Sequence, residues 1–281
     1  MSWRLSRDVE AFADQAWELL AARPAEQTVA LSIIESLRAG QRWSDVAPVF
    51  GWYDDGGDVR GAVCMTPPFE MVLAVVPDEA VAPLVRTLRD EDVAPPGVNG
   101  DVRIVERFSG AWLEGTDLQA RTTFEQRLYG LGTLQPPDPP PPGRARPGGE
   151  GDVDLAASWI RAFQEEAGVH STDVESAARA GIAGGRVWLW EDETGTAVSL
   201  AGRTPPAAGM SRIAPVYTPP EARRRGYGAA VTAACTADAL ARGAEHVVLF
   251  TDLANPTSNS VYQRVGFRPL SDRRVVRFER P

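Results

Sequence analysis

The spacing of apolar residues predicts alternating helices and strands in the second half of the chain. Leu155, Trp159 and Phe163 recur at the spacing of one helical face. Turn residues around 195 and 205–209 separate three apolar runs of strand type. The expected elements are helices at 152–168 and 172–183, strands at 186–191, 196–203 and 210–218, a helix at 226–242, a strand at 245–251, a short helix at 257–265 and a strand pair within 267–278.

The first half predicts a similar order of elements without repeating the residues. The order strand, two helices, three strands, helix, helix, strands is thus expected twice, which indicates two domains of related fold. The expected elements are a strand at 3–7, helices at 9–22 and 26–39, strands at 46–53, 59–65 and 71–76, helices at 79–90 and 101–113, and a strand pair within 119–134.

A proline-rich stretch from Gln135 to Arg144 lies between the two halves. Consecutive prolines cannot donate to a helix or a sheet and favour extended polyproline II. We expect a semi-rigid spacer; the other interpretation is a rigid arm packed on the surface of a single domain. The predicted organisation is a domain at 1–135, a linker at 136–143 and a domain at 144–281.

The composition of the chain narrows the classes of function that the protein can have. A chain of 281 residues is longer than one typical domain. Its net charge of −9 argues against a nucleic-acid partner and suits an amine-bearing one. Cys64 and Cys235 have no spacing typical of a metal site or a disulfide, so we expect no metal and two buried free thiols. Without a signal-like start or a long apolar run, we expect a cytoplasmic protein without a membrane partner.

The most informative chemical feature is a basic loop between a strand and a helix. A strand ends at Tyr217 and Thr218, a Pro-Pro-Glu turn follows, and three arginines and two glycines precede an alanine-rich helix. Free amides and the dipole of the helix start attract an anion, and glycine lets a phosphate approach the backbone. The matching stretch of the first half, 75–81, has two carboxylates and neither glycine nor arginine. Only the second half is therefore expected to bind a phosphate in this way.

Two common phosphate-binding motifs are excluded by particular residues. A P-loop requires Lys and Ser or Thr after its last glycine, but Ala229 and Ala230 follow Gly228. A dinucleotide-binding fingerprint requires a third glycine where Val231 stands, and this loop also follows three consecutive strands.

The loop resembles motif A of the GCN5-related N-acetyltransferase (GNAT) superfamily, Arg/Gln-x-x-Gly-x-Gly/Ala, with Arg223, Gly226 and Gly228 in place. The segment 249–267 is similar to the next strand and helix of that superfamily, which end in Tyr-x-x-x-Gly-Phe. The resemblance covers 144–281; for 1–135 it is one of element order only. It implies an α/β (α+β) fold with two GNAT-like domains, each a mixed, mostly antiparallel twisted sheet flanked by helices. The domain at 144–281 would be catalytic, and the degenerate domain at 1–135 would lack the pyrophosphate loop.

The resemblance implies an acyl-CoA-dependent N-acyltransferase that transfers acetyl from acetyl-CoA to a primary amine by direct attack through a tetrahedral intermediate. Tyr262 would be catalytic, as the proton donor to the leaving thiolate; its other interpretation is a packed aromatic residue. Asn255 and Asn259 would contact the cofactor. The other interpretation of Asn255 is a turn residue that flanks a helix, and that of Asn259 is an exposed helix position. The expected cofactor-binding residues are Val216, Tyr217, Thr218, Arg223, Arg224, Arg225, Gly226, Tyr227, Gly228, Ala229, Asn255 and Asn259.

The general base and the acceptor are not identified by the sequence. Some members of the superfamily carry a glutamate on the strand before the loop, but 210–216 contains no carboxylate. The acceptor is an amine-bearing small molecule or peptide, and the chain is a monomer or a homodimer. A non-catalytic acyl-CoA-binding sensor or regulatory protein is the alternative function. The candidates for the base are His170, Glu165, Glu166, Glu175 and Asp252, whereas His246 is expected to be structural.

Overall fold

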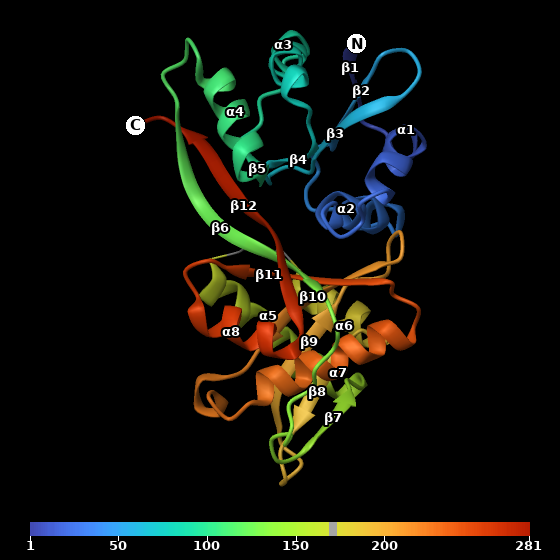
Figure 1. Cartoon of the computed structure of the whole chain (residues 1–281), viewed down its shortest axis with the longest axis vertical. Helices are drawn as coiled ribbons and strands as arrows, with labels where there is room; N and C mark the ends of the chain where they lie inside the picture. The colour runs from blue at the N-terminus through green and yellow to red at the C-terminus, as the bar shows by residue number, and fades with distance from the viewer. Residues whose placement is uncertain (169–172) are drawn as a thin grey trace. The chain divides into compact units, whose positions relative to one another are not determined.

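The computed structural model describes residues 1–168 and 173–281, which form two compact units (Figure 1). Unit 1 consists of Met1–Leu128, Asp252–Ala254 and Leu270–Pro281. Unit 2 consists of Tyr129–Thr251 and Asn255–Pro269.

Unit 1 is a mixed sheet with helices on both faces. Its strands follow the order β1-β2-β3-β4-β5-β12. Neighbouring strands are antiparallel except for β4 and β5, which are parallel from Met71↔Val98 to Leu73↔Gly100. Its elements are β1 Ser2–Ser6, α1 Val9–Ala21, α2 Thr28–Arg38, β2 Val49–Asp54, β3 Val59–Met65, β4 Met71–Val75, α3 Val81–Asp90, β5 Gly97–Asp101, α4 Val102–Leu113 and most of β6 Gln119–Leu131.

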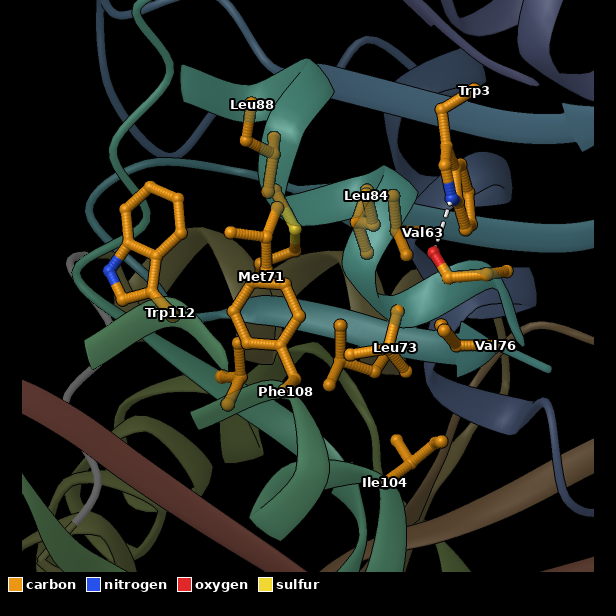
Figure 2. Packing of buried hydrophobic residues seen from close by; sticks show 14 of the residues in the cluster. Trp3, Val63, Met71, Leu73, Val76, Leu84, Leu88, Ile104, Phe108 and Trp112 are labelled. Atoms are coloured by element: carbon orange, nitrogen blue, oxygen red, sulfur yellow. Dashed lines mark hydrogen bonds between the residues drawn. The ribbon is translucent and has the colours of Figure 1, made fainter. Parts of the chain in front are cut away.

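The two faces of the unit 1 sheet are covered by different helices. On one face, Phe12 of α1 stacks on Phe50 of β2 with ring centroids 4.9 Å apart. On the other face, the apolar sides of α3 and α4 pack on β4, as Figure 2 shows for Leu84, Phe108 and Leu73. Unit 1 thus has its own buried core.

Unit 2 is built in the same way. Its strands follow the order β11-β10-β9-β8-β7, antiparallel except for the parallel pair β10 and β11. The core under α7 includes Ile213 and Val247, and the core under α5 and α6 includes Leu200. Its elements are β7 Arg144–Pro147, α5 Val153–Ala167, α6 Val174–Ala183, β8 Val187–Glu191, β9 Ala197–Arg203, β10 Met210–Tyr217, α7 Tyr227–Ala241, β11 His246–Asp252, α8 Pro256–Val265 and the start of β12 Phe267–Glu279.

The predicted fold class is confirmed. The order of elements is repeated, as predicted, but in both units a strand lies between the last two helices. Unit 1 runs β1-α1-α2-β2-β3-β4-α3-β5-α4, and unit 2 runs β7-α5-α6-β8-β9-β10-α7-β11-α8. The strands β5 and β7 were not predicted, because their sequences, Gly-Val-Asn-Gly-Asp and Arg-Ala-Arg-Pro, lack an apolar alternation.

The prediction of two strand pairs is wrong. The stretches 119–134 and 267–278 each form one long strand, β6 and β12. In unit 1, β12 pairs with β5 from Arg273↔Asp101 to Arg277↔Gly97, and the Thr123 hydroxyl of β6 donates to the carbonyl of Val275 in β12 at 3.3 Å. Hydrogen-bond partners along the strand favour its continuation over a turn.

The compact units differ from the contiguous domains expected at 1–135 and 144–281. The last residues of the chain, Leu270–Pro281, belong to unit 1, because they pair with β5 there. The proline-rich segment lies within unit 2 and not between the units. The Trp190 indole donates to the Pro142 carbonyl at 3.0 Å, which resembles the packed arm more than the spacer.

Cys64 and Cys235 are buried and free, as predicted. Burial raises the pKa of each thiol to about 12, so both stay protonated and unreactive at neutral pH. Through the ranges that the structure describes, no helix has the length and apolar character needed to cross a bilayer.

Candidate functional site

The parallel strands β10 and β11 separate at their carboxyl ends. Their pairing runs from Met210↔His246 to Arg212↔Val248, and no later pair joins them in the described residues. On its other edge β10 stays paired with β9 to Tyr217↔Leu200, with a register shift between Ile213 and Val216. Such a bulge bends a strand. The backbone of 213–217 therefore has an edge beside β11 on which an extended ligand can form strand-like hydrogen bonds.

The loop after β10 ends in a row of free amides. The Ala222 and Arg223 amides donate to Pro219 and Pro220, at 2.9 and 3.3 Å, and the next amide with an acceptor is that of Ala230, on Gly226 at 3.1 Å. The backbone N–H groups from 224 to 229 have no acceptor in the part of the chain that the structure describes. Gly226 caps α7 with its backbone alone, so the helix dipole adds positive charge to this row. The loop is a cradle for an anion such as a phosphate.

The two glycines of the cradle have different roles. Gly226 has φ of 86°, a left-handed conformation that other residues adopt with strain. At Gly228, an added Cβ would stand 3.2 Å from the Thr218 hydroxyl, which lies 2.8 Å from the Ser199 hydroxyl. Gly228 therefore allows the start of α7 to approach the end of β10.

The three arginines of the loop are not equivalent. The Arg223 guanidinium donates to both Glu166 oxygens, at 2.6 and 2.8 Å, and to the Thr218 carbonyl at 2.8 Å. It ties the loop to α5, and its side chain is not free for a phosphate. Arg224 and Arg225 are exposed, and neither forms an ion pair within the described residues. Their guanidinium groups are available to an anion in the cradle.

Tyr262 lies on α8 with its ring partly buried. The ring packs against the core under α7 and meets Phe267 edge to face, with centroids 6.3 Å apart. No hydrogen bond involves its hydroxyl in the described part of the chain, and burial raises the pKa of Tyr262 to about 12. Packing fixes the ring, as the alternative interpretation expects, while the hydroxyl keeps its proton and stays available as a donor.

The two asparagines of α8 have structural partners. The Asn255 side chain accepts from the Ser258 amide at 3.0 Å and so caps the helix, which matches its interpretation as a turn residue. The Asn259 side chain accepts from the Tyr129 hydroxyl at 2.8 Å and donates to the Asn255 carbonyl at 2.7 Å. Asn259 is thus not an exposed helix position, and its amide is occupied on both sides.

Other predicted cofactor residues place only their backbone near the cradle. The ring of Tyr217 is buried against Trp159, with centroids 6.2 Å apart, and burial raises the pKa of Tyr217. The ring of Tyr227 is buried in the core under α7, and Val216 packs on the same core. Ala229 belongs to the row of free amides.

The structure does not single out a general base. Glu166 is held by Arg223, and Glu175 is paired with Arg161. Asp252 accepts from the Ala254 amide at 2.7 Å. Glu165 is exposed, and His170 lies outside the described residues. His246 opens β11 and is exposed.

The corresponding loop of unit 1 has no such cradle in its described residues. A 3-10 turn, Asp78–Ala80, leads directly into α3. The Trp3 indole donates to the Ala80 carbonyl at 2.8 Å, and the Asp78 carboxylate is bound by Arg103 at 2.8 Å (Figure 2 shows the Trp3 contact). A carboxylate stands where unit 2 presents arginines. Throughout the described ranges, no group of His, Cys, Asp and Glu is arranged to hold a metal ion.

Arg212 has no place in the predicted motifs, yet it is the last β10 residue paired with β11. The signal for it in the sequence is a charged residue inside an apolar strand, between Ser211 and Ile213.

Comparison with known proteins gives a family match and a shared fold. Residues 195–276 match the family described as FR47-like protein. This segment includes the separating strands, the cradle, α8 and Tyr262. No curated protein sequence matches the chain significantly.

Solved structures match over nearly the whole chain. A GCN5-related N-acetyltransferase from Sphaerobacter thermophilus is 17% identical, with a TM-score of 0.60 over 99% of this chain and 96% of that one. An acetyltransferase from the GNAT family of Colwellia psychrerythraea is 11% identical, with a TM-score of 0.59 over 100% of both chains. A tandem GNAT protein from the clavulanic acid biosynthesis pathway is 13% identical, with a TM-score of 0.57 over 99% of this chain and 98% of that one. At these identities the likeness concerns the fold.

Proposed function

We propose that the chain is a member of the GCN5-related N-acetyltransferase superfamily and an acyl-CoA-dependent N-acyltransferase, which its fold and its FR47-like segment support. The donor is acetyl-CoA, and the acceptor is a primary amine of a small molecule or peptide. The observation that carries this proposal is the row of acceptor-free amides from 224 to 229 at the start of α7. A pyrophosphate supplies the missing acceptors, and the exposed Arg224 and Arg225 add charge.

Different residues of unit 2 act in different steps of the proposed reaction. The thioester supplies an activated acyl carbon. The amine attacks this carbon directly to form a tetrahedral intermediate, and the carbon–sulfur bond breaks when the intermediate collapses. The backbone of 213–217 holds the pantetheine arm along the free edge of β10. Tyr262 gives its hydroxyl proton to the departing sulfur and recovers a proton from solvent. The amine loses its proton to water or to a base among the acidic residues named above.

A second candidate function is an acyl-CoA-binding sensor without turnover. Two observations favour it: β10 carries no carboxylate, and the acidic candidates near α5 and α6 are ion-paired or exposed. Both functions require a site for the phosphates of CoA, so the cradle by itself does not distinguish between them.

Thiol release separates the two functions. We expect the purified chain to release free thiol from acetyl-CoA in the presence of at least one class of primary amine, at a rate of at least ~10-fold over its hydrolysis of acetyl-CoA without amine, because a bound amine is positioned for attack. A thiol reagent measures the product, and calorimetry measures CoA binding. Tight CoA binding without thiol release from any amine class would establish the sensor.

The two unpaired arginines give a second test. We expect the double variant Arg224→Gln/Arg225→Gln to raise the Kd for CoA about 10-fold at low salt, since charge-assisted hydrogen bonds to a phosphate are lost at an exposed site. The Kd of the variant should also depend less on salt. Arg179→Gln, an exposed arginine of α6, is the matched control. An unchanged Kd with the same salt dependence would remove both arginines from the site.

A further inference from the structure

Among the residues that the structure describes, the guanidinium group of Arg212 has no counter-ion. It is half-buried on β10, and its hydrogen bonds within the described residues come from the backbone: its N–H donates to the Thr204 hydroxyl at 3.0 Å, and its carbonyl accepts from the Thr204 amide at 2.9 Å. Burial lowers the pKa of Arg212 to about 10, and no carboxylate opposes this shift. The group is therefore charged at neutral pH and unpaired, which is costly for a partly buried ion.

Two other arginines on strands of unit 2, the buried Arg203 and the half-buried Arg146, have the carboxylate partners that Arg212 lacks among the described residues. Arg203 on the neighbouring strand is bound by Asp238 of α7, with nitrogen–oxygen distances of 2.9 and 3.0 Å. Arg146 on β7 is bound by Asp152 and Glu191. The chain supplies carboxylates to both. Arg186 is also half-buried without an ion pair in the described residues, but its guanidinium donates to the Ala180 carbonyl at 2.8 Å, whereas no described residue accepts from the guanidinium of Arg212.

The position of Arg212 relates it to the reacting end of the site. It is the last residue of β10 that pairs with β11, so it stands where the two strands begin to separate. Ile213 belongs to the core under α7, and side chains alternate along a strand. Arg212 therefore lies on the opposite face, which α5 covers, as Tyr217 against Trp159 also shows. This places it away from the phosphate cradle, at the far end of the free β10 edge.

We propose that Arg212 binds a carboxylate of one of the two reactants beside the thioester. The inference rests on the proposed function, because it takes the phosphates of the donor to lie in the cradle and its uncharged pantetheine arm to lie along β10. An anion that reaches Arg212 then belongs either to the acceptor or to the acyl group. An amino acid or a free peptide end carries both an amine and a carboxylate, and a dicarboxylic acyl group carries a second carboxylate. Guanidinium binds either in a bidentate manner.

Matched pairs of compounds test this inference and distinguish the two sources. For the acceptor, kcat/KM with acetyl-CoA is compared between amino acids and their amides, such as glycine and glycinamide, across a panel of side chains. N-acetylamino acids and their amides are titrated in the presence of CoA, which needs no turnover. For the acyl group, succinyl-CoA is compared with butyryl-CoA. The proteins are the full chain, Arg212→Gln, Arg212→Lys and the control Arg86→Gln, an exposed arginine of α3.

We expect the full chain to prefer the carboxylate member of at least one pair by ~10- to 100-fold, since one charge-assisted bidentate contact is gained. Arg212→Gln should bring this ratio close to one, and Arg86→Gln should leave it unchanged. If Arg212→Gln does not fold, Arg212→Lys still tests the inference, because it keeps the charge and loses the bidentate geometry, so the ratio should fall severalfold.

The outcomes for the inference and for the proposed function are separable. A preference that survives in Arg212→Gln, or the absence of preference in every pair, overturns the role of Arg212 while thiol release sustains the transferase. Carboxylate-selective binding that depends on Arg212, without thiol release from any amine, sustains the inference and overturns the transferase.

Discussion

Replacing Gly226 by valine is expected to abolish measurable binding of CoA, with Kd raised at least ~100-fold. Gly226 has φ of 86°, and a β-branched residue in that region costs on the order of 1–3 kcal/mol. The loop therefore leaves this conformation, and the amides from 224 to 229 no longer converge. Each lost hydrogen bond to a charged phosphate weakens binding by about 1.5–3 kcal/mol, so a few suffice for the predicted loss.

Backbone strain has to be separated from the loss of the cradle. Gly243 follows the other end of α7 with φ of 89° and has no atom near an added Cβ. Gly243→Val is thus a control with the same strain, remote from the loop. Thermal unfolding should show similar losses for both variants, whereas calorimetry should show lost CoA binding for Gly226→Val alone. Equal CoA affinities in the two variants would mean that the loop is not the phosphate site.

The helices and the loop could be predicted because their signals are local. The period of Leu155, Trp159 and Phe163 arises from one helix, and the structure has α5 there. The loop is similarly local, since glycine and arginine within a few residues shape the cradle. The lengths of β6 and β12 have a different origin. They depend on partner strands that are distant in sequence. Neither the presence nor the absence of a turn signal in the sequence reveals such a partner.

Side-chain partners explain what the sequence left open in the site. Arg223 was expected at the cofactor, but Glu166, 57 residues away, occupies its guanidinium. Asn259 was expected to contact the cofactor or to be exposed, but Tyr129, 130 residues away, binds its side chain. Neither partner can be inferred from local spacing. Arg212 illustrates the reverse case, because only the structure reveals that this arginine of an apolar strand has no carboxylate partner among the described residues.

Replacing Tyr262 by phenylalanine is expected to lower kcat by about 10²- to 10³-fold and to leave the Kd for CoA within about twofold. General-acid catalysis typically accounts for a factor of this size. The ring of Tyr262 packs on the core and on Phe267, and phenylalanine keeps both contacts. Stability should change little, since the hydroxyl has no partner to lose among the described residues. Steady-state kinetics, CoA calorimetry and thermal unfolding measure these three quantities.

Tyr53→Phe is the matched control, because it removes a hydroxyl from a buried ring of unit 1, the unit whose corresponding loop has no cradle in its described residues. It should leave kcat unchanged. The pH profile adds a sharper criterion. Burial raises the pKa of Tyr262 to about 12, so the acid form persists through neutral and mildly alkaline pH. The ratio of kcat between the full chain and Tyr262→Phe should therefore stay constant from roughly pH 7 to 10, below this pKa, whereas an ordinary tyrosine with a pKa near 10 would lose part of its advantage there. A full rate in Tyr262→Phe would leave Tyr262 as a packing residue and would require solvent to protonate the leaving sulfur.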